Sequence, residues 1–473
     1  MVNVISNGVI AGSVNTIELR EGIFDASHSI VNVDLNYTPC VNNSITRMFQ
    51  NSSNLSRVYN FNENITSMNH TFAECRNLTY VSNIPNSVSD MGACFYNCHN
   101  MIESPELPTN LTTLWATYQN CTSLVNGPTV IPNSVTNLRM AFMRCHNLQS
   151  VPNLEHLSVT DLYGSFSYCN NLTSVHTLPT NVIYLQHAFE GCSLLEEAPS
   201  IPNSVTNMIN TFSYCSNLVN APIIPNSVVN MSGTFSHCQN LFSIPDIPNS
   251  VTNMHDTFYN CHNLTTAPNI SNNVIDMGYT FANCYNLTTP PQNIPDTVTD
   301  MQGTFRNCHS LLYTPTISNN AQSLYYTFGA CSNITVAPNI PDSVHSMFGT
   351  FQKCYKLKTV GKISNSVITM NYAFQFCYNI TNSPDMSGST EITHMLNTFR
   401  YCTSLSGDIV IVSNKIVSAT NCFTDTALTK NVYIPFTYEN GVNTETYNAF
   451  INAGYDTNGP SCGVYLKDIN EIN

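Results

Sequence analysis

Residues Ile201–Pro222 read IPNSVTNMINTFSYCSNLVNAP, and variants of this unit follow one another along most of the chain. The Phe of the unit recurs at steps of 23 residues, sometimes 24 and once 25. A fixed period of this kind is typical of repeat proteins, and it predicts about seventeen coils of roughly 23 residues. The series comprises Phe49, Phe72, Phe95, Phe142, Phe166, Phe189, Phe212, Phe235, Phe258, Phe281, Phe305, Phe328, Phe351, Phe374, Phe399 and Phe423, with Tyr118 in the one gap.

Three further positions of the unit keep step with the Phe. Met or Leu stands four residues before it, as in Met68, Met91, Leu114, Leu138, Leu162, Leu185, Met208, Met231, Met254, Met277 and Met301. Cys stands three residues after it in fifteen units: Cys75, Cys98, Cys121, Cys145, Cys169, Cys192, Cys215, Cys238, Cys261, Cys284, Cys308, Cys331, Cys354, Cys377 and Cys402. Leu, Ile or Met stands six residues after it, as in Leu78, Met101, Leu124, Leu218, Leu264 and Ile334.

One unit cannot bury its apolar side alone, whereas stacked units align Met, Phe, Cys and Leu into continuous internal ladders. The offsets of these four residues favour a short helical turn. The Asn-Ser-Val-Thr-Asn-Met stretch and the Leu-x-x-x-Pro stretch each favour a short extended segment. Pro removes a backbone donor and is expected at strand ends or corners, where the Asn that follows it supplies the turn.

The units resemble the BspA-like leucine-rich repeats, including the Met-x-x-x-Phe-x-x-Cys-x-x-Leu variant found in bacterial surface proteins. The resemblance covers residues 41–423. It implies a repeat solenoid with short parallel β-strands, used for adhesion and ligand binding without catalysis.

The two ends of the chain leave the period. Residues 1–40 include the alternating stretch Ile30–Leu35, which predicts a strand, and we expect them to form an N-terminal cap or an anchoring segment. Residues 424–473 are expected to form a C-terminal cap. There, Val432–Pro435 and Thr446–Phe450 resemble the strand, Pro and short helix that close many such arrays, and Gly463–Asp468 predicts a last strand.

Composition excludes several classes of partner. Charged residues make up 9% of the chain, the net charge is −14, and Lys and Arg together number 15. Clustered cations are absent from the sequence, so nucleic acids and anionic membranes are not expected partners. No apolar run reaches the roughly 18 residues of a membrane helix. Met1–Ile10 has neither a basic region nor a long apolar core, so we expect assembly in the cytoplasm unless a secretory signal has been removed.

The Cys and His residues do not indicate a catalytic site or a metal site. Of the 19 Cys, fifteen occupy one repeat position, where a reduced thiol packs as a small hydrophobe. No C-x-x-C pair indicates zinc. Any disulfide or reactive thiol would involve Cys40, Cys94, Cys422 or Cys462, which lie off this position. The His residues are scattered, so no enzymatic activity and no cofactor are predicted.

The residue after the Cys offers a candidate binding stripe. Stacked coils bring one repeat position into a row, and rings combined with Asn suit sugars or a protein partner. The alternative is a packed, half-exposed corner row. The predicted stripe consists of His262, Tyr285, His309, Tyr355 and Tyr378, with Ser332 among them. A second row, just before the Cys, contains Tyr168, Tyr214, His237, Phe376 and Tyr401.

These observations favour a protein that mediates attachment and has no enzymatic activity. The function we expect is receptor binding or decoration on a bacteriophage virion, for example in a tail or head fibre, through a host-surface glycan or protein. The caps could contact other virion proteins. The alternatives are a bacterial cell-surface adhesin of the BspA-like type and a purely structural scaffold.

Overall fold

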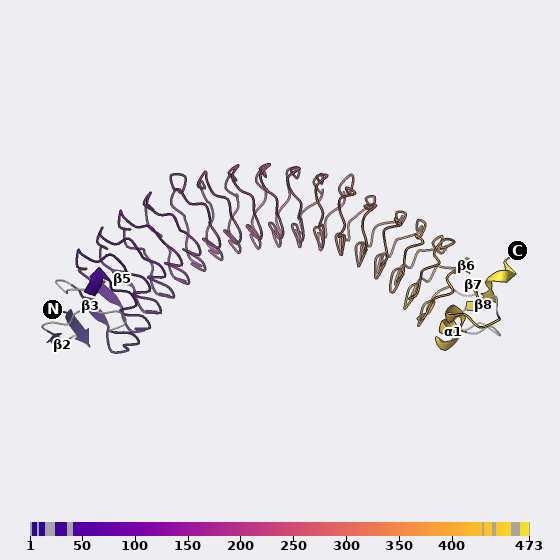
Figure 1. Ribbon diagram of the computed structural model, residues 1–473, viewed down its shortest axis with the longest axis horizontal. Helices are drawn as coiled ribbons and strands as arrows, with labels where there is room; N and C mark the ends of the chain where they lie inside the picture. The colour runs from indigo at the N-terminus through magenta and orange to yellow at the C-terminus, as the bar shows by residue number, and fades with distance from the viewer. Residues whose placement is uncertain are drawn as a thin grey trace. The chain divides into compact units, whose positions relative to one another are not determined.

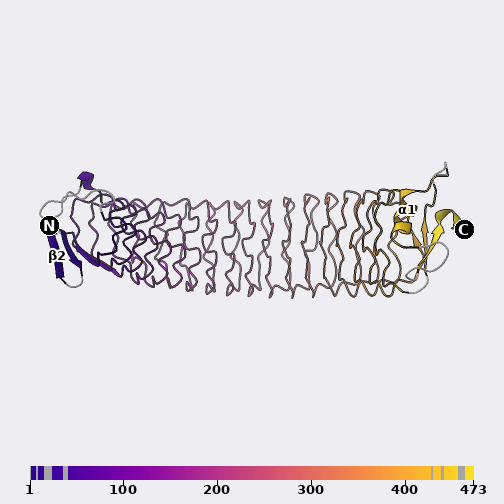
Figure 2. The same cartoon turned by 90° about the horizontal axis from the view of Figure 1, so that it is seen from below.

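The computed structural model describes residues 2–6, 9–14, 24–35, 41–427, 430–437, 441–455 and 464–472. The chain forms two compact units, Met1–Leu241 and Phe242–Asn473. Within each unit, successive coils of the chain lie side by side (Figures 1 and 2). Cys40 and Cys462 lie outside the described residues.

A five-stranded sheet begins the first unit (Figure 1). Its strand order is β2-β1-β3-β4-β5, with β1 antiparallel to β2 and β3, while β3, β4 and β5 are parallel. The predicted strand within Ile30–Leu35 is confirmed as β3, and a short 3₁₀ helix, η1, follows it. The elements are β1 (Val2–Ser6), β2 (Val9–Val14), β3 (Asn32–Asp34), η1 (Val41–Asn43), β4 (Arg57–Tyr59) and β5 (Tyr80–Val81).

A parallel three-stranded sheet and the only α-helix of the described residues close the second unit (Figure 1). The strand order is β6-β7-β8, and the expected strand, helix and last strand of this end are all present. The Thr444 side chain accepts a hydrogen bond from the Tyr447 N–H and so caps α1. The elements are β6 (Ile409–Val410), β7 (Lys430–Ile434), α1 (Glu445–Asn452), β8 (Val464–Asp468) and η2 (Ile469–Glu471).

Between these ends, neighbouring coils pair in parallel but mostly through single bridges. The residue just before the Met carries one such series, for example Ser67 with Asp90 and Asp90 with Thr113. A second series runs through the segment after the Leu, as between Glu197 and Asn220. The extended segments are therefore as parallel as the sequence predicts, and shorter than regular strands.

The expected helical turn between Met and Cys is a different structure. In Met208–Cys215, alternate N–H groups close four-residue β-turns, such as Thr211 to Met208, while the others bond the next coil, such as Phe212 to Thr234. Asn210 and Tyr214 have φ values of 50° and 61°. Residues with a left-handed backbone interrupt a right-handed helix. In addition, N–H groups that donate hydrogen bonds to the next coil cannot bond within the segment.

Stacked rings form the centre of each unit. In the first unit, the rings from Phe24 to Phe235, with Tyr118 among them, lie 5.2–5.8 Å apart between centroids and within 24° of parallel. In the second, the rings from Phe258 to Phe423 lie 5.4–5.7 Å apart. Phe450 of α1 stacks on Phe423 at 6.1 Å. The ladder thus continues into the segment that follows the repeats, which the sequence period did not reveal.

Two hydrogen-bonded ladders run beside the rings. The Cys thiol donates to the carbonyl of the Phe one coil earlier, as from Cys215 to Phe189 at 3.2 Å. The buried Thr before the Phe donates to the carbonyl of the earlier Met or Leu, as from Thr211 to Leu185 at 2.9 Å. The Cys position is therefore more than a small apolar site, since its thiol satisfies a buried carbonyl.

Candidate ligand-binding surface

The turn that contains Phe and Cys sends two side chains per coil toward the outside. The residue just before the Cys is left-handed in coil after coil, for example Tyr168 at φ 58° and Phe376 at φ 63°. Such a backbone is unusual for a bulky residue. Its N–H bonds the next coil, as from Tyr214 to Ser236 at 2.7 Å, so the coil-to-coil ladder holds this conformation in place.

The predicted stripe after the Cys lies at the surface of the second unit. Tyr285, Tyr355 and Tyr378 expose 37%, 40% and 39% of their surface. His309 is also exposed, whereas His262 is half-buried and its pKa is lowered by burial. These side chains are not part of the packed core.

The stripe consists of two stacks of rings. Tyr285 lies between His262 and His309, with ring centroids 4.6 Å and 5.3 Å away. Tyr355 and Tyr378 stack at 5.4 Å with an angle of 11° between their planes. Ser332 occupies this position in the coil between the two stacks. The rings are therefore ordered one against the other and present edges and faces to solvent.

The second row also stacks, in both units. Tyr214 and His237 lie 4.1 Å apart in the first unit, and Phe376 and Tyr401 lie 4.7 Å apart in the second. Tyr168 belongs to the same row and donates a hydrogen bond from its hydroxyl to Glu190 at 3.1 Å. Its pKa is raised by burial and by the nearby Glu190 carboxylate.

In the first unit, the two rows together border a hollow of about 370 Å³. Rings line one side of it and neutral hydrogen-bonding groups line the other. The ring of Tyr168 lies over Gly191, where an added Cβ would come within 2.6 Å of its Cδ1 atom. The lining residues are Tyr168, Gly191, Tyr214 and His237 in one row and Asn170, Ser193, Ser216 and Gln239 in the other. Sequence reasoning identified the rings but not this pairing of the rows.

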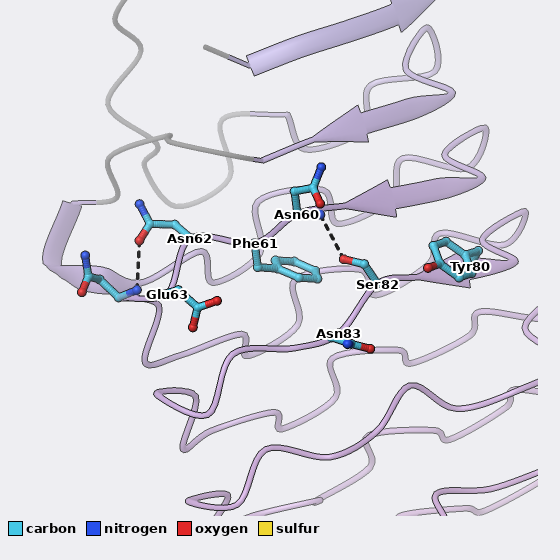
Figure 3. A pocket seen from close by; sticks show the side chains of 8 residues that line it. Asn60, Phe61, Asn62, Glu63, Tyr80, Ser82 and Asn83 are labelled. Carbon is cyan, nitrogen blue, oxygen red and sulfur yellow. Dashed lines mark hydrogen bonds between the residues drawn. The ribbon is translucent and has the colours of Figure 1, made fainter.

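A larger hollow of about 690 Å³ lies beside β4 and β5 (Figure 3). Its lining is mainly amide and hydroxyl groups from Asn60–Asn64 and from Ser82 and Asn83, with the Phe61 and Tyr80 rings. The Asn60 N–H donates to the Ser82 hydroxyl at 3.0 Å. Nothing in the repeat pattern distinguishes this region, because its polar residues follow no ladder.

The geometry offers no constellation for catalysis or metal binding in the part of the chain that is described. No group of three or more His, Cys, Asp or Glu side chains there is placed to hold a metal ion. The seventeen Cys residues that the structure describes are buried, and burial raises the pKa of thiols such as Cys215 and Cys94 well above its ordinary value. A buried, protonated thiol is a poor nucleophile.

The described helices include none that is long and apolar enough to cross a lipid bilayer.

Three comparisons relate the chain to known proteins. A family model described as "BspA type Leucine rich repeat region (6 copies)" matches residues 5–125, 92–219, 209–335 and 324–453. No curated protein matches the sequence. Among solved structures, a leucine-rich repeat protein from Bacteroides ovatus is 22% identical, covers 80% of this chain and 96% of its own, and gives a TM-score of 0.54. A leucine rich cell surface protein from Faecalibacterium prausnitzii is 19% identical, covers 82% of this chain and 86% of its own, and gives a TM-score of 0.33.

The first of these structures shares the fold, and the family matches together extend over nearly the whole chain. They include the Met, Phe, Cys and Leu ladders of both units. The protein belongs to the BspA-type leucine-rich repeat family.

Proposed function

We propose that this protein is a non-enzymatic recognition protein that binds a host-surface glycan or protein through exposed rings of its solenoid. The observation that carries the proposal is the stacked stripe of the second unit: His262, Tyr285, His309, Tyr355 and Tyr378. Rings held by their neighbours lose little rotamer freedom on binding, so their contacts contribute more of their energy to affinity. The low content of charged residues fits an uncharged ligand.

In this proposal the protein is part of a bacteriophage particle, where it would serve as a tail fibre, head fibre or decoration. The alternative is that it is displayed on a bacterial cell envelope. Antibodies against the purified chain, applied to phage particles and to intact bacteria in electron micrographs, would distinguish the two settings. A purely structural scaffold would instead bind neither cells nor glycans.

We further propose that residues 1–40 and 424–473 act as caps of the repeat region at 41–423. The contacts at the C-terminal end support this assignment. Thr446 of α1 accepts a hydrogen bond from the Ile416 N–H at 3.0 Å and donates one to the Ser413 carbonyl at 2.7 Å. The Tyr455 hydroxyl accepts from the Phe423 N–H at 2.8 Å. The Phe423 N–H, whose equivalents in other coils bond the following coil, as from Phe399 to Cys422, is thereby satisfied, and Thr446 satisfies two further backbone groups of the last coils. Such caps could also bind other virion proteins.

The test replaces Tyr285, Tyr355 and Tyr378 together by Ser. Since all three side chains are exposed, we expect the melting temperature to stay nearly unchanged. Attachment to host cells and to an immobilised glycan panel should weaken tenfold or more, which corresponds to about 1.4 kcal/mol. Tyr313→Ser provides the control, because this ring is 52% exposed but lies off the stripe. Unfolding of the triple variant would show that the row is structural, and unchanged binding would move the binding surface elsewhere.

A further inference from the structure

A separate hollow lies in the first unit, on the coils of Phe49, Phe72, Phe95 and Tyr118. Its volume is about 430 Å³. It contains none of the stripe residues, which belong to the other unit, so a ligand in this hollow would bind independently of the stripe. Its lining comprises three ring side chains, three small side chains, three amides and one carboxylate: Trp115, Tyr96, His70, Ala73, Ala93, Ala116, Gln50, Asn51, Gln119 and Glu74.

Small residues contribute to the floor of the hollow at a repeat position that is a ring in some coils and Gly in others. Two residues after the Met or Leu, other coils carry rings such as Tyr279 and Tyr326, whereas these coils carry Ala93 and Ala116. Both Ala residues have left-handed backbones, with φ values of 50° and 51°. Ala gains nothing from that conformation, in which Gly or Asn is less strained. The choice of Ala therefore leaves an apolar floor with space above it.

Trp115 forms the wall of this hollow. It is the single Trp of the sequence, it is 37% exposed, and its Cε3 atom lies above Gly92, 3.5 Å from where a Cβ would be. The centroid of the His70 ring is 6.0 Å from that of Trp115. Burial is the main cause that lowers the pKa of His70, followed by the nearby Arg47 cation, so the ring stays neutral at pH 7. The hollow thus has a flat, uncharged aromatic side.

Hydrogen-bonding groups on the lining are left over for a ligand. Within the described residues, the Gln50 amide and the Tyr96 hydroxyl have no hydrogen-bond partner, and Gln119 makes only a long contact of 3.7 Å to the Met143 sulfur. All three side chains are half-buried. An amide can both donate and accept, which suits a hydroxyl group.

The charge of the lining selects against anions. Its carboxylate, Glu74, is already paired with Arg76 at 3.1 Å and also accepts from Asn97. Neither Arg76 nor Arg47, the cation near His70, is a lining residue, so a phosphate, sulfate or carboxylate in the hollow would touch no Lys or Arg side chain of the lining. Aromatic faces beside neutral amides are complementary to a pyranose, which has C–H groups on its faces and hydroxyls around its edge.

We propose that this hollow is a binding site for a neutral pyranose, with the Trp115 ring against a face of the sugar and the Gln50 and Gln119 amides on its hydroxyls. The site would add a second, independently acting recognition point to the molecule.

The single Trp makes the test direct, because Trp fluorescence, excited at a wavelength where the 24 Tyr residues do not absorb, reports on this hollow alone. The intact chain would be titrated with methyl glycosides of glucose, galactose, mannose and N-acetylglucosamine, with glucuronic acid and glucose 6-phosphate as anionic probes. We expect a saturable change with at least one neutral glycoside and at least tenfold weaker binding of the anions. Gln50→Ala with Gln119→Ala should weaken the response tenfold or more.

Two further variants guard against loss of folding. Trp115→Ala should abolish binding, which calorimetry would measure in this variant because it has no Trp. Its circular dichroism spectrum and melting curve should stay close to those of the parent chain. Tyr184→Ala removes an exposed ring elsewhere in the same unit and should bind normally. No saturable response to any neutral glycoside would overturn the proposal, as would equal binding of the anions or retention of binding by folded Trp115→Ala. A saturable response to short aromatic peptides alone would likewise contradict it and indicate a protein ligand.

Discussion

At the scale of single residues, each repeat position has its own physical task. The Phe ring stacks on its neighbours, while the Thr hydroxyl and Cys thiol each satisfy a carbonyl of the earlier coil. The Met or Leu before the Phe and the Leu after the Cys fill the rest of the apolar core. A substitution in one coil therefore removes contacts to two neighbouring coils at once.

Phe189→Ala tests the ring ladder. Phe189 is fully buried and stacks on Phe166 and Phe212 at 5.7 Å and 5.6 Å. The expected loss in the free energy of unfolding is about 3–5 kcal/mol, since the cavity cannot close without moving both neighbours. Denaturant unfolding measures it. Gln239→Ala on the surface should cost less than about 0.5 kcal/mol. Similar losses at both positions would contradict the ladder.

The thiol ladder predicts a specific response to alkaline pH. Burial raises the pKa of ladder thiols such as Cys308 well above the ordinary 9.0, so the folded protein keeps them protonated. In the unfolded chain they ionise near that ordinary value. Stability is therefore constant below it and falls as pH rises beyond it, by about 1.4 kcal/mol per pH unit for each thiol that ionises only on unfolding.

Urea unfolding at several pH values from neutral to alkaline measures this free energy of unfolding. Alkylation of the thiols provides an independent second measurement. We expect iodoacetamide to label the described thiols only after urea is added, because all seventeen are buried. A free energy of unfolding that does not fall in alkali, or rapid labelling of the native protein, would refute the assignment.

At the scale of the coil, the sequence predicted the period and the core better than the backbone. The Phe, Met, Cys and Leu positions are buried as expected, because periodic apolar residues report directly on a shared interior. The predicted helical turn was wrong because the same offsets also fit a run of four-residue β-turns. Left-handed residues such as Asn210 and Tyr214 are chosen by pairing with the next coil, which no local pattern encodes.

The same limit applies to the candidate sites. The rings of the stripe could be listed from the sequence, and their exposure follows from their place outside the core positions. The hollows at Tyr168 and at Trp115 could not, because each depends on a small residue in a neighbouring coil. Gly191 and Ala93 are uninformative when the sequence is read alone. They become meaningful once the coil-to-coil register places a ring beside them.

Gly191→Ala tests this relation between neighbouring coils. Gly191 has φ +72°, and an added Cβ would come within 2.6 Å of the Tyr168 ring. The methyl group should lower the free energy of unfolding by about 1 kcal/mol or more and push the ring away from its place over the coil. Nuclear magnetic resonance of the Tyr168 ring and denaturant unfolding would detect both effects. Gly441→Ala is the matched control, because Gly441 also has a left-handed backbone, with φ +79°, and nothing lies within 4 Å of its Cβ position. Equal effects of the two changes would exclude the contact.

At the scale of the whole molecule, stability in a repeat protein is close to a sum over coils and the interfaces between them. Terminal coils have only one neighbouring coil, so the segments beyond the repeats must satisfy their exposed backbone. The Tyr455 hydroxyl does this for the Phe423 N–H, and the side chain of Thr446 holds two further buried groups, the Ile416 N–H and the Ser413 carbonyl. The consequence is that damage at an end should remain near that end.

Thr446→Val keeps the volume of the side chain but removes both hydrogen bonds. Each buried group left without a partner costs about 1–3 kcal/mol. We expect hydrogen exchange to accelerate in the two coils that contain Cys402 and Phe423, and to stay unchanged in residues 41–241. Asn448→Ala lies on the exposed side of the same helix and should leave exchange unaltered throughout. If Thr446→Val accelerates exchange equally in both units, the chain unfolds as one cooperative body and the nearest-neighbour description is wrong for it. If exchange changes nowhere, the hydrogen bonds of Thr446 do not hold this end, and the capping role passes to the stacked Phe450 ring and the Tyr455 hydroxyl.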